Sequence, residues 1–254
     1  MDRFTRTELL IGSDGLAKLA QKKVAVFGVG GVGSFTVEAL ARSGIGSLTL
    51  VDYDEICITN LNRQIHALES TVGRPKVEVM AERLLEINPA ISLRLHQKFY
   101  SATNREELLT SDLDFVIDAI DTVTSKVDLI LNCTQKGIPI ISSMGTGNKL
   151  DPLRFQLADI SKTHTDPLAK AVRSLLRKHG VTSGVQVLFS TEIPQQTKLI
   201  TEMEVRDYTA NDFEVINKRR QIPGSISFVP PVAGMIIAGA VIRNLLVQGG
   251  VISK

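Results

Sequence analysis

The sequence of 254 residues predicts an α/β fold, in which a doubly wound and mostly parallel sheet carries additional antiparallel strands and a C-terminal helix. One observation is an apolar run, 24–29, that leads into a glycine-rich turn and then into a helical pattern. Another is the alternation of short apolar runs with segments of helical periodicity, which is typical of parallel sheets with crossover helices. The hydrophobic content of 43% is enough to bury a full core.

The first 150 residues contain the clearest alternation of strands and helices. We expect strands at the apolar runs 23–29, 47–51, 92–95, 114–118 and 138–143. We expect helices at 32–43, 76–87, 104–109 and 124–136. In the helix at 76–87 apolar residues recur at helical spacing until Asn88-Pro89. Gly137 ends the helix at 124–136. This alternation is typical of a nucleotide-binding unit.

After residue 147 the pattern changes. Strands are expected at 154–160 and 186–190, with a cationic helix at 167–178. No apolar period persists from 191 to 223, which indicates a mobile loop. The last apolar segment, 226–247, is rich in small residues that suit close packing, so we expect a buried core helix. Contact of this segment with a membrane is the alternative.

Composition limits the classes of function. The net charge of +2 and the pI near 8.5 permit nucleic-acid binding only through a local patch. The N-terminus is polar and unlike a signal sequence, and the chain has two cysteines, Cys57 and Cys133. These features predict a reducing, cytoplasmic location, and they exclude a four-cysteine zinc site within one chain.

The glycine-rich turn and the acidic strand end that follows it predict nucleotide binding. A strand, a turn with glycine at positions 28, 30, 31 and 33, and a helix are followed about twenty residues later by Asp52-Tyr53-Asp54. This is the Rossmann-like arrangement, with phosphates at the helix N-terminus and an acidic side chain on the ribose. Tight turns need glycine whatever they bind, and either aspartate could instead cap a loop. Asp52 ends the strand itself and is therefore the better ribose ligand.

Polar and cationic residues next to this motif point to a triphosphate. Asn60-Leu-Asn-Arg63-Gln is followed by Arg74-Pro-Lys76, and a dehydrogenase has no need of so many cations beside a pyrophosphate. Asp118 and Asp121 lie at a strand's carboxyl end, where open sheets bind ligands. A carboxylate there could hold Mg²⁺ or could cap the next helix, and the residues alone leave both readings open. For His66 and both cysteines, packing is favoured over catalysis.

Together these motifs resemble the ThiF/MoeB/ubiquitin-activating superfamily, whose members adenylate carboxylates. The resemblance rests on Gly-x-Gly-Gly-Val-Gly-Ser at 28–34, Asp-x-Asp at 52–54, Asn-x-Asn-Arg-Gln at 60–64, Lys76 and Asp-Ala-Ile-Asp at 118–121. Within it, the runs 57–68, 118–121 and 166–169 are most similar to the tRNA threonylcarbamoyladenosine dehydratases. The similarity covers roughly residues 3–192 and the C-terminal helix. It implies a single adenylating domain, with a nucleotide-binding half at 1–150 and a tRNA-facing half at 151–254.

The resemblance also implies a role for each site residue. Asp52 and Asp54 lie at the nucleotide, where Asp52 takes the ribose hydroxyls, and Asp121 carries Mg²⁺. The residues that approach the phosphates are Gly28, Gly30, Gly31 and Gly33. The residues that hold the triphosphate and stabilise the departing pyrophosphate are Asn60, Arg63 and Lys76. Arg6 matches an arginine that reaches the nucleotide of the other subunit, which implies a homodimer; a charge on a frayed terminus is the alternative.

The implied reaction is ATP-dependent cyclisation of threonylcarbamoyladenosine next to the anticodon. The threonine carboxylate is adenylated, a nucleophile of the same side chain closes the ring, and AMP leaves. Adenylation of a ubiquitin-like or sulfur-carrier protein is the second hypothesis, and a nicotinamide-dependent dehydrogenase the third. Too few cysteines for zinc-binding pairs favour the dehydratase branch. Binding of a monovalent cation and of a sulfur-relay protein stays open.

The candidate tRNA contacts are cationic. They are Lys162, Lys170, Arg173, Arg177, Lys178 and the run 218–220. Residues 170, 173 and 177 share one face of the predicted helix, as phosphate contacts along a backbone would require. A solvated charged face is the alternative. With no Trp and three Tyr in the chain, no aromatic platform for stacking bases is expected.

Overall fold

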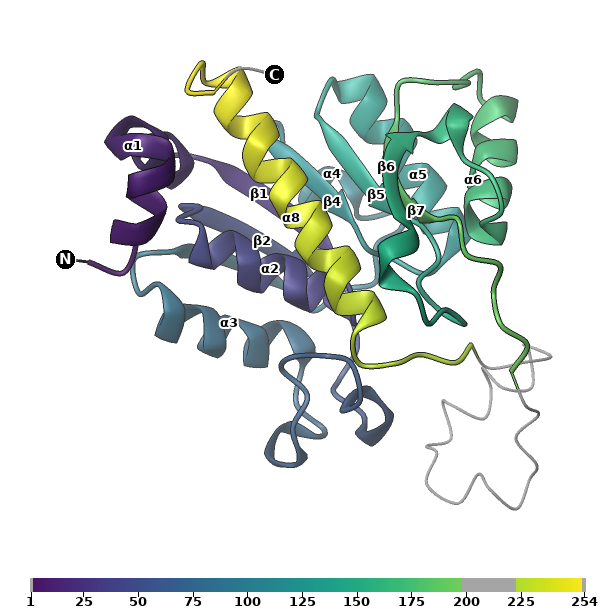
Figure 1. Ribbon diagram of the computed structural model, residues 1–254, viewed down its shortest axis with the longest axis horizontal. Helices are drawn as coiled ribbons and strands as arrows, with labels where there is room; N and C mark the ends of the chain where they lie inside the picture. Colours follow the sequence, from purple (N-terminus) through teal and green to yellow (C-terminus); the bar gives the residue numbers. More distant parts are fainter. Residues whose placement is uncertain (1, 198–222, 253–254) are drawn as a thin grey trace.

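The computed structural model describes residues 2–197 and 223–252 of this protein (Figure 1). Most of the loop expected at 191–223, including the cationic run 218–220, lies outside these residues. The described part is one α/β unit with helices on both faces of a central sheet (Figure 1).

The sheet has seven strands in the order β3-β2-β1-β4-β5-β7-β6. The strands are β1 (Lys23–Phe27), β2 (Ser47–Val51), β3 (Ser92–His96), β4 (Phe115–Asp118), β5 (Ile140–Ser143), β6 (Phe155–Asp159) and β7 (Gln186–Ser190). All neighbours pair in parallel except β6 and β7, which pair antiparallel. The doubly wound, mostly parallel sheet is therefore confirmed, and β6 is its antiparallel strand.

The helices largely occupy the expected segments. They are α1 (Thr5–Ala20), α2 (Gly33–Arg42), α3 (Lys76–Ile87), α4 (Arg105–Leu108), α5 (Val123–Lys136), α6 (Pro167–Lys178) and α8 (Val229–Gln248). The described residues also form four short 3-10 helices, η1 (Ile58–Asn60), η2 (Glu69–Thr71), η3 (Pro152–Arg154) and η4 (Ile160–Lys162). The sequence did not predict α1. Its residue Gly12 has φ 72° and kinks the helix, and Leu9 and Leu10 are exposed, so apolar periodicity is weak there.

Alternate residues of the central strands supply the cores on the two faces of the sheet. Val24 and Val26 of β1 point into a cluster with α2, α3 and α8, whereas Ala25 and Phe27 point into a cluster with α5. A third cluster lies between α5, α6 and β7. The sheet is thus covered on both faces. The carboxyl ends of its strands are therefore the place where a ligand is expected to bind.

The C-terminal helix α8 packs back onto the first half of the chain (Figure 1). A Cβ at Gly234 would come within 2.4 Å of the carbonyl oxygen of Val32, so only glycine permits this close approach to the start of α2. Thr36 Oγ1 donates a hydrogen bond to the carbonyl of Gly234 at 3.2 Å. By length and composition α8 could also cross a membrane, with a mean hydropathy of 1.6, but 61% of its apolar window is buried here. The expected packing of this helix is therefore confirmed.

Candidate active site

The expected site residues gather at the carboxyl edge of the sheet. In the sheet register Phe27 lies between Val51 and Asp118, so the strands β1, β2 and β4 end side by side. The turn after β1, the loop that joins β2 to α3 and the loop after β4 therefore lie at one edge of the sheet, and we call the region between them the crevice. This is the switch point where open α/β sheets bind ligands.

The four glycines of the turn have different structural roles. A Cβ at Gly28 would lie 2.6 Å from the carbonyl oxygen of Ala119, and one at Gly33 would lie 1.8 Å from that of Gly28. Gly28 also has φ 90°, so both glycines are required by the fold itself. At Gly31 a Cβ would meet Pro230 at 3.0 Å and the Arg63 stem at 3.3 Å.

Gly30 is the glycine that leaves open space. The nearest atom to its hypothetical Cβ is Gln64 Nε2 at 3.9 Å. Among the described residues, the backbone N–H groups of Gly30, Gly31 and Val32 donate to no acceptor. These amides precede α2, whose N-terminus carries partial positive charge, so together they form an anion-binding turn. The turn fits a phosphate.

Asp52 supports this turn from the end of β2. Its carboxylate accepts hydrogen bonds from the N–H of Val29 at 2.6 Å and from the N–H of Asp54 at 2.9 Å. Burial raises the pKa of Asp52, opposed by Lys76 and these two hydrogen bonds. Each carboxylate oxygen has a second lone pair, so ribose hydroxyls could still be bound. The sequence reasoning missed the bond to Val29, which ties the acidic strand end to the glycine turn.

Lys76 is the buried cation of the crevice. It begins α3, its side chain is 6% exposed, and its Nζ lies 2.6 Å from Asp54 Oδ2. The N–H of Lys76 also donates to the carbonyl of Asp54 at 3.1 Å. An ammonium has three donors, so two remain beyond the bond to Asp54. Asp54 thus positions the ammonium of Lys76 beside Asp52. The resemblance had assigned Asp54 only a contact with the nucleotide.

Arg63 covers the glycine turn from the loop before α3. Its Nη1 donates to the carbonyl of Thr59 and to Asn62 Oδ1, both at 2.9 Å, while its other N–H groups have no acceptor among the described residues. Burial lowers the pKa of the guanidinium, although an arginine stays charged. A half-buried cation with free donors over an anion-binding turn is suited to a phosphate chain.

Asn60 and Gln64 shape the same loop. Asn60 Oδ1 accepts from the N–H of Cys57 at 3.2 Å and closes the turn of η1, which is a structural role that the motif alone did not reveal. Gln64 is buried, and its Oε1 has no hydrogen-bond partner in the described structure. An unpaired buried amide oxygen beside Gly30 is costly, and a ligand with a donor would satisfy it.

The loop after β4 is anchored by a buried ion pair. Lys126 and Asp118 are both fully buried, and Lys126 Nζ donates to Asp118 Oδ2 at 2.8 Å, to Ser142 Oγ at 3.3 Å and to the carbonyl of Ser143 at 2.9 Å. Ser142 Oγ donates to the same Asp118 oxygen at 2.5 Å. This network joins the ends of β4 and β5. Asp118 is therefore structural, and the sequence reasoning missed Lys126.

Asp121 lies exposed beyond this anchor. Burial, followed by the charges of Asp54, Asp121 and Asp52, raises the pKa of Tyr53 to about 12, which indicates that all three carboxylates lie in the neighbourhood of this residue. No group of three potential metal ligands is present among residues 2–197 and 223–252. Mg²⁺ commonly uses one or two carboxylates and takes its other ligands from phosphates and water, so Asp121 fits it without such a cage.

Arg6 is not brought to the crevice within one chain. It is exposed on α1, and nearby Arg3 donates to the carbonyl of Ile87 at 2.8 Å, at the end of α3. Lys76 is at the start of α3, about 16 Å away along the helix axis. Any contact of Arg6 with a nucleotide therefore requires a second chain.

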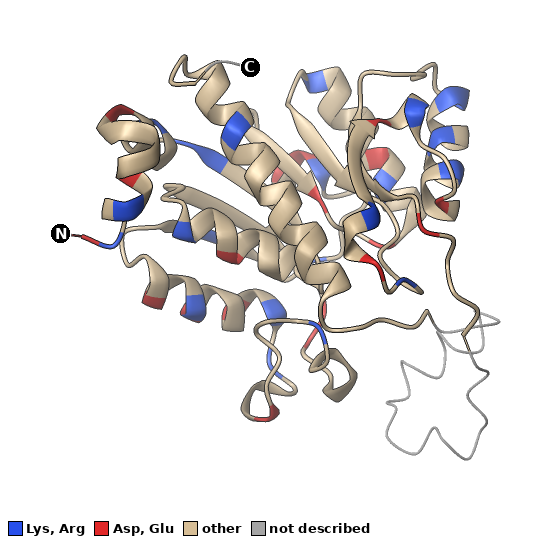
Figure 2. Cartoon of the chain, in the orientation of Figure 1, with Lys and Arg blue, Asp and Glu red and all other residues tan. Residues whose placement is uncertain are grey.

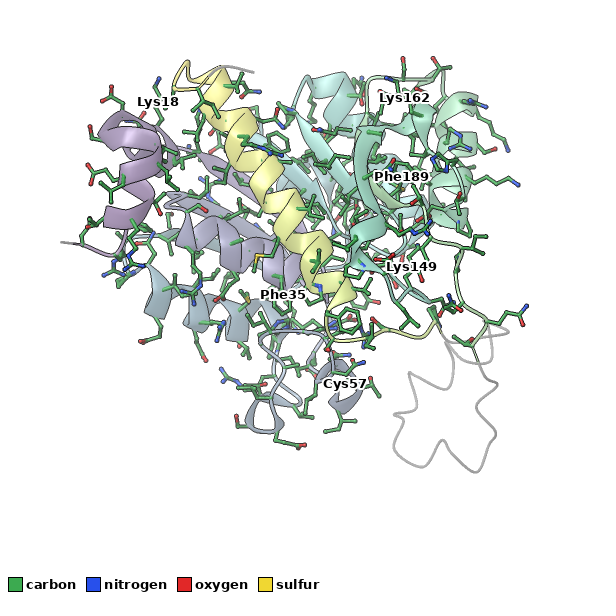
Figure 3. All side chains as sticks on the ribbon, viewed as in Figure 1. Lys18, Phe35, Cys57, Lys149, Lys162 and Phe189 are labelled. Carbon is green, nitrogen blue, oxygen red and sulfur yellow. The ribbon has the colours of Figure 1, made fainter. Side chains whose placement is uncertain are left out.

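His66 and the two cysteines are packing residues in this structure. Burial, then the charges of Lys76 and Arg83, lowers the pKa of His66 to about 4, and neither ring nitrogen has a partner in the described structure. Burial raises the pKa of Cys133 to about 12, which rules out a thiolate at neutral pH. Cys57 is half-buried in the loop between β2 and α3, at the lower side of the view in Figure 3. Its sulfur accepts a hydrogen bond from Thr59 Oγ1 at 3.4 Å.

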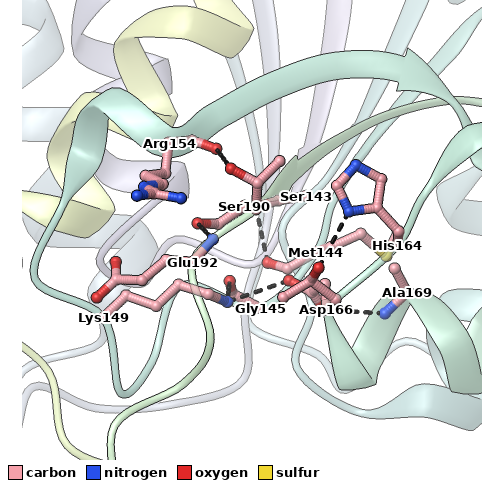
Figure 4. A network of polar contacts seen from close by, with 12 residues as sticks. Ser143, Met144, Gly145, Lys149, Arg154, His164, Asp166, Ala169, Ser190 and Glu192 are labelled. Carbon is pink, nitrogen blue, oxygen red and sulfur yellow. Dashed lines mark hydrogen bonds and ion pairs between the residues drawn. The ribbon is translucent and has the colours of Figure 1, made fainter.

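A second buried ion pair holds the chain after β5. Lys149 Nζ lies 3.1 Å from Asp166 Oδ2 and also bonds the carbonyl of Gly145, as Figure 4 shows. Asp166 Oδ1 caps α6 by accepting from the N–H of Ala169 at 3.0 Å. The preceding residue, Thr165, has φ 65°, a strained value for a β-branched side chain. This pair fastens α6 to the carboxyl edge of the sheet.

Asn148 joins two segments that are distant in sequence. Its backbone N–H donates to the carbonyl of Gly224 at 2.8 Å, its Oδ1 accepts from the N–H of Gly224 at 2.5 Å, and its carbonyl accepts from the N–H of Gln195 at 2.7 Å. Its φ of 59° is one that asparagine tolerates. Neither Lys149 nor Asn148 was singled out by the sequence reasoning, since no local pattern marks their partners.

Two known proteins and a solved structure are similar to this chain. The tRNA threonylcarbamoyladenosine dehydratase of Bacillus subtilis (strain 168) is 51% identical over 246 residues, which are 97% of this chain and 95% of that protein. The dehydratase of Escherichia coli (strain K12) is 43% identical over 197 residues, covering 75% and 74% of the two chains. The crystal structure of the E. coli enzyme with ATP has a TM-score of 0.85 at 34% identity and covers 98% of this chain and 95% of that one.

The family model agrees over nearly the whole length of the chain. The model for the ThiF family matches residues 4–252, which include every residue of the crevice described above. With that match and the 51% identity to a full-length relative, the resemblance drawn from the motifs is confirmed. The chain belongs to the ThiF family.

Proposed function

We propose that this protein is an ATP-dependent enzyme that cyclises threonylcarbamoyladenosine in tRNA with net loss of water. The observation that carries the proposal is the anion-binding turn at 30–32 with the buried ammonium of Lys76 and the half-buried guanidinium of Arg63 beside it. The 51% identity over nearly full length to a dehydratase of this specificity supports the choice of substrate.

The crevice suits adenylation because its charges can offset a polyanion. An oxygen of the threonine carboxylate attacks the α-phosphorus of ATP, and the bond from that phosphorus to the pyrophosphate oxygen breaks. A carboxylate that approaches a triphosphate meets repulsion, which cations reduce. The amides of the turn would hold the phosphates, and Arg63 and Lys76 would stabilise the charge that develops on the departing pyrophosphate. Asp52 would bind the ribose hydroxyls.

The second step uses the mixed anhydride as an activated acyl group. A nucleophile of the same side chain attacks its carbonyl carbon, the bond to AMP breaks, and a proton is released to solvent. The sum of both steps is AMP, pyrophosphate and a ring that lacks one water. No enzyme thiol is required, and the buried Cys133, whose pKa is raised to about 12, could not supply one.

Further parts of the proposal concern metal, subunits and domain organisation. Mg²⁺ held by Asp121 would neutralise phosphate charge. Arg6 of a second copy would complete each site, so we propose a homodimer. We also propose one adenylating domain, in which residues 1–150 bind the nucleotide and residues 151–254 face the tRNA.

The test is release of AMP from ATP and Mg²⁺ with tRNA that carries threonylcarbamoyladenosine, against the same tRNA without that modification. We expect turnover only with the modified tRNA, and a nucleoside lighter by one water in mass analysis. The Lys76→Met variant should form AMP about 10²–10³-fold more slowly, whereas Lys98→Met, at an exposed ion pair, should match wild type. Turnover with neither tRNA would refute the proposal, and pyrophosphate exchange with a glycine-tailed carrier protein would replace it.

A further inference from the structure

A set of exposed cations lies along α6 and the η4 turn, and none of them is paired with a carboxylate of the described residues. Their side chains form no hydrogen bond or ion pair within the described residues. They are Lys162, Lys170, Arg177 and Lys178, which we call the α6 cationic face. Figure 2 shows Lys and Arg following one another along α6, and Figure 3 labels Lys162 beside it.

Elsewhere on the described surface, exposed cations are largely neutralised by acidic neighbours. Such pairs are Lys23–Asp112, Arg42–Glu38, Arg74–Glu82, Lys98–Glu107 and Lys136–Glu106. By contrast, the sequence of α6 contains no Asp or Glu, and Asp166 before it is buried and paired with Lys149. A cluster of cations without counter-charges repels itself, so its free energy falls when an anionic partner arrives.

The helix that carries this face is a rigid platform. Ala169, Val172 and Leu176 are buried in the core against α5 and β7. Arg173 points back to the fold, since its Nη1 donates to the carbonyl of Thr163 at 2.7 Å and also bonds that residue's hydroxyl. Arg173, expected from the sequence to contact tRNA, is therefore structural, and the face consists of the other four cations.

The platform is also connected to the active-site crevice. Asp166, at the start of α6, pairs with Lys149, which also bonds the carbonyl of Gly145 just after β5. The end of β5 is joined in turn to β4 by the buried network of Lys126. From there α6 runs about 18 Å along the side of the sheet, away from the carboxyl edge (Figure 1). A tRNA whose modified nucleoside is in the crevice can thus continue along α6 with the stem that adjoins this nucleoside.

The chemistry of the face favours a phosphate backbone over other anionic partners. The exposed residues of α6 other than its cations are Pro167, Ala171 and Ser174. A protein partner would need an apolar anchor, and bases would need an aromatic surface for stacking, but α6 offers neither. Sequence-independent contacts to phosphates need only cations placed along a line.

We propose that the α6 cationic face binds the backbone phosphates of the tRNA stem that adjoins the modified nucleoside. This proposal rests on the function proposed above. The face would supply affinity and orientation, whereas the crevice recognises the modified nucleoside. It predicts that the face contributes to tRNA binding and not to the chemical step.

The experiment compares two triple variants with the same loss of charge. K170Q/R177Q/K178Q removes three free cations of the face. R94Q/K98Q/K136Q is the matched control, since each of its cations already pairs with a carboxylate. Binding of tRNA is measured by fluorescence anisotropy between 50 and 300 mM KCl, together with ATP binding and single-turnover AMP formation at saturating tRNA.

For the face variant we expect tRNA affinity to fall about 50-fold or more at 150 mM KCl, and the slope of log K against log salt to flatten by about 2 to 3. ATP binding and the single-turnover rate should match wild type, and the control should stay within about threefold. An unchanged affinity and salt slope in the face variant, with an active wild type, would overturn this inference alone. A wild type that does not turn over modified tRNA would instead refute the proposed function.

Discussion

Replacing Lys126 by Met tests whether the buried network between β4 and β5 stabilises the fold. The substitution removes an ammonium that donates to Asp118, Ser142 and the carbonyl of Ser143, all of them buried. Asp118 keeps only the hydroxyl of Ser142 and the N–H of Ile120, at 2.5 and 3.0 Å. Its charge is then left inside the protein without a counter-ion.

The expected cost is large. Breaking a buried pair by removing one partner destabilises by about 3–5 kcal/mol. For a chain of this size, each kcal/mol lowers the Tm by about 2–4 °C, so the Tm should fall by about 6–20 °C. Differential scanning fluorimetry at fixed protein concentration would measure it, because association with a second copy also raises the apparent Tm.

Two further variants make the result interpretable. Lys136→Met changes the same residue type on the same helix, but its partner Glu106 is open to solvent, so the Tm should change little. Adding Asp118→Asn to Lys126→Met removes the orphaned charge, and the double variant should be less destabilised than the sum of the singles. A Tm of the Lys126→Met protein equal to that of the Lys136→Met protein would refute the reasoning.

Three other predictions concern the crevice and its surroundings. Gly30→Ala should keep the wild-type Tm but weaken ATP binding, because the nearest protein atom to its Cβ is 3.9 Å away, whereas Gly33→Ala should lower the Tm. Calorimetric titration of ATP and melting curves would distinguish the two variants. Equal losses of Tm would contradict this assignment. Lys76→Met should lower the rate of AMP formation by about 10²–10³ without changing the KM for tRNA, and a changed KM alone would show that the ammonium only helps binding. The pKa of His66 is lowered from 6.5 to about 4 by burial, so the unfolded chain takes up its proton first and stability falls as the pH drops from about 6.5 to about 4. This loss is at most about 3 kcal/mol, and urea unfolding of His66→Gln should lack it; an unchanged pH slope would contradict the shift.

The sheet and most helices could be predicted because their signals are local. β1 and α3 each follow from a short run of residues whose apolar period belongs to one element. The strand expected at 23–29 ends at Phe27 because Gly28 adopts a positive φ and Val29 turns toward Asp52. Boundaries like this depend on a partner far along the chain, which an apolar period does not encode.

The candidate site shows the same limit. The motif located Asp52, Arg63 and Lys76 in one crevice, but it did not separate residues that could contact a ligand from those that build the fold. Gly28 and Gly33 proved to be required by neighbouring backbone, and Asn60 Oδ1 closes a turn. These roles follow from tertiary contacts, since the same residue type serves a turn or a phosphate equally well.

The partners of the two buried lysines could not be predicted from the sequence. Lys126 lies on the apolar face of α5, where a charge contradicts the helical pattern, and Lys149 lies in a loop with no pattern. Their partners are 8 and 17 residues away in the chain. A lysine that breaks an apolar face is the one signal available, and it indicates a buried acid without saying which.

The position of α8 over the glycine turn has a consequence for the order in which the protein is made. Pro230 and Gly234 lie against Gly31 and Val32, which leave the ribosome some 200 residues earlier. At about 5–20 residues per second, the turn waits about 10–40 s for the helix that covers it. During that interval the apolar side of α2 is uncovered, so we expect nascent chains to need protection until the last segment has emerged.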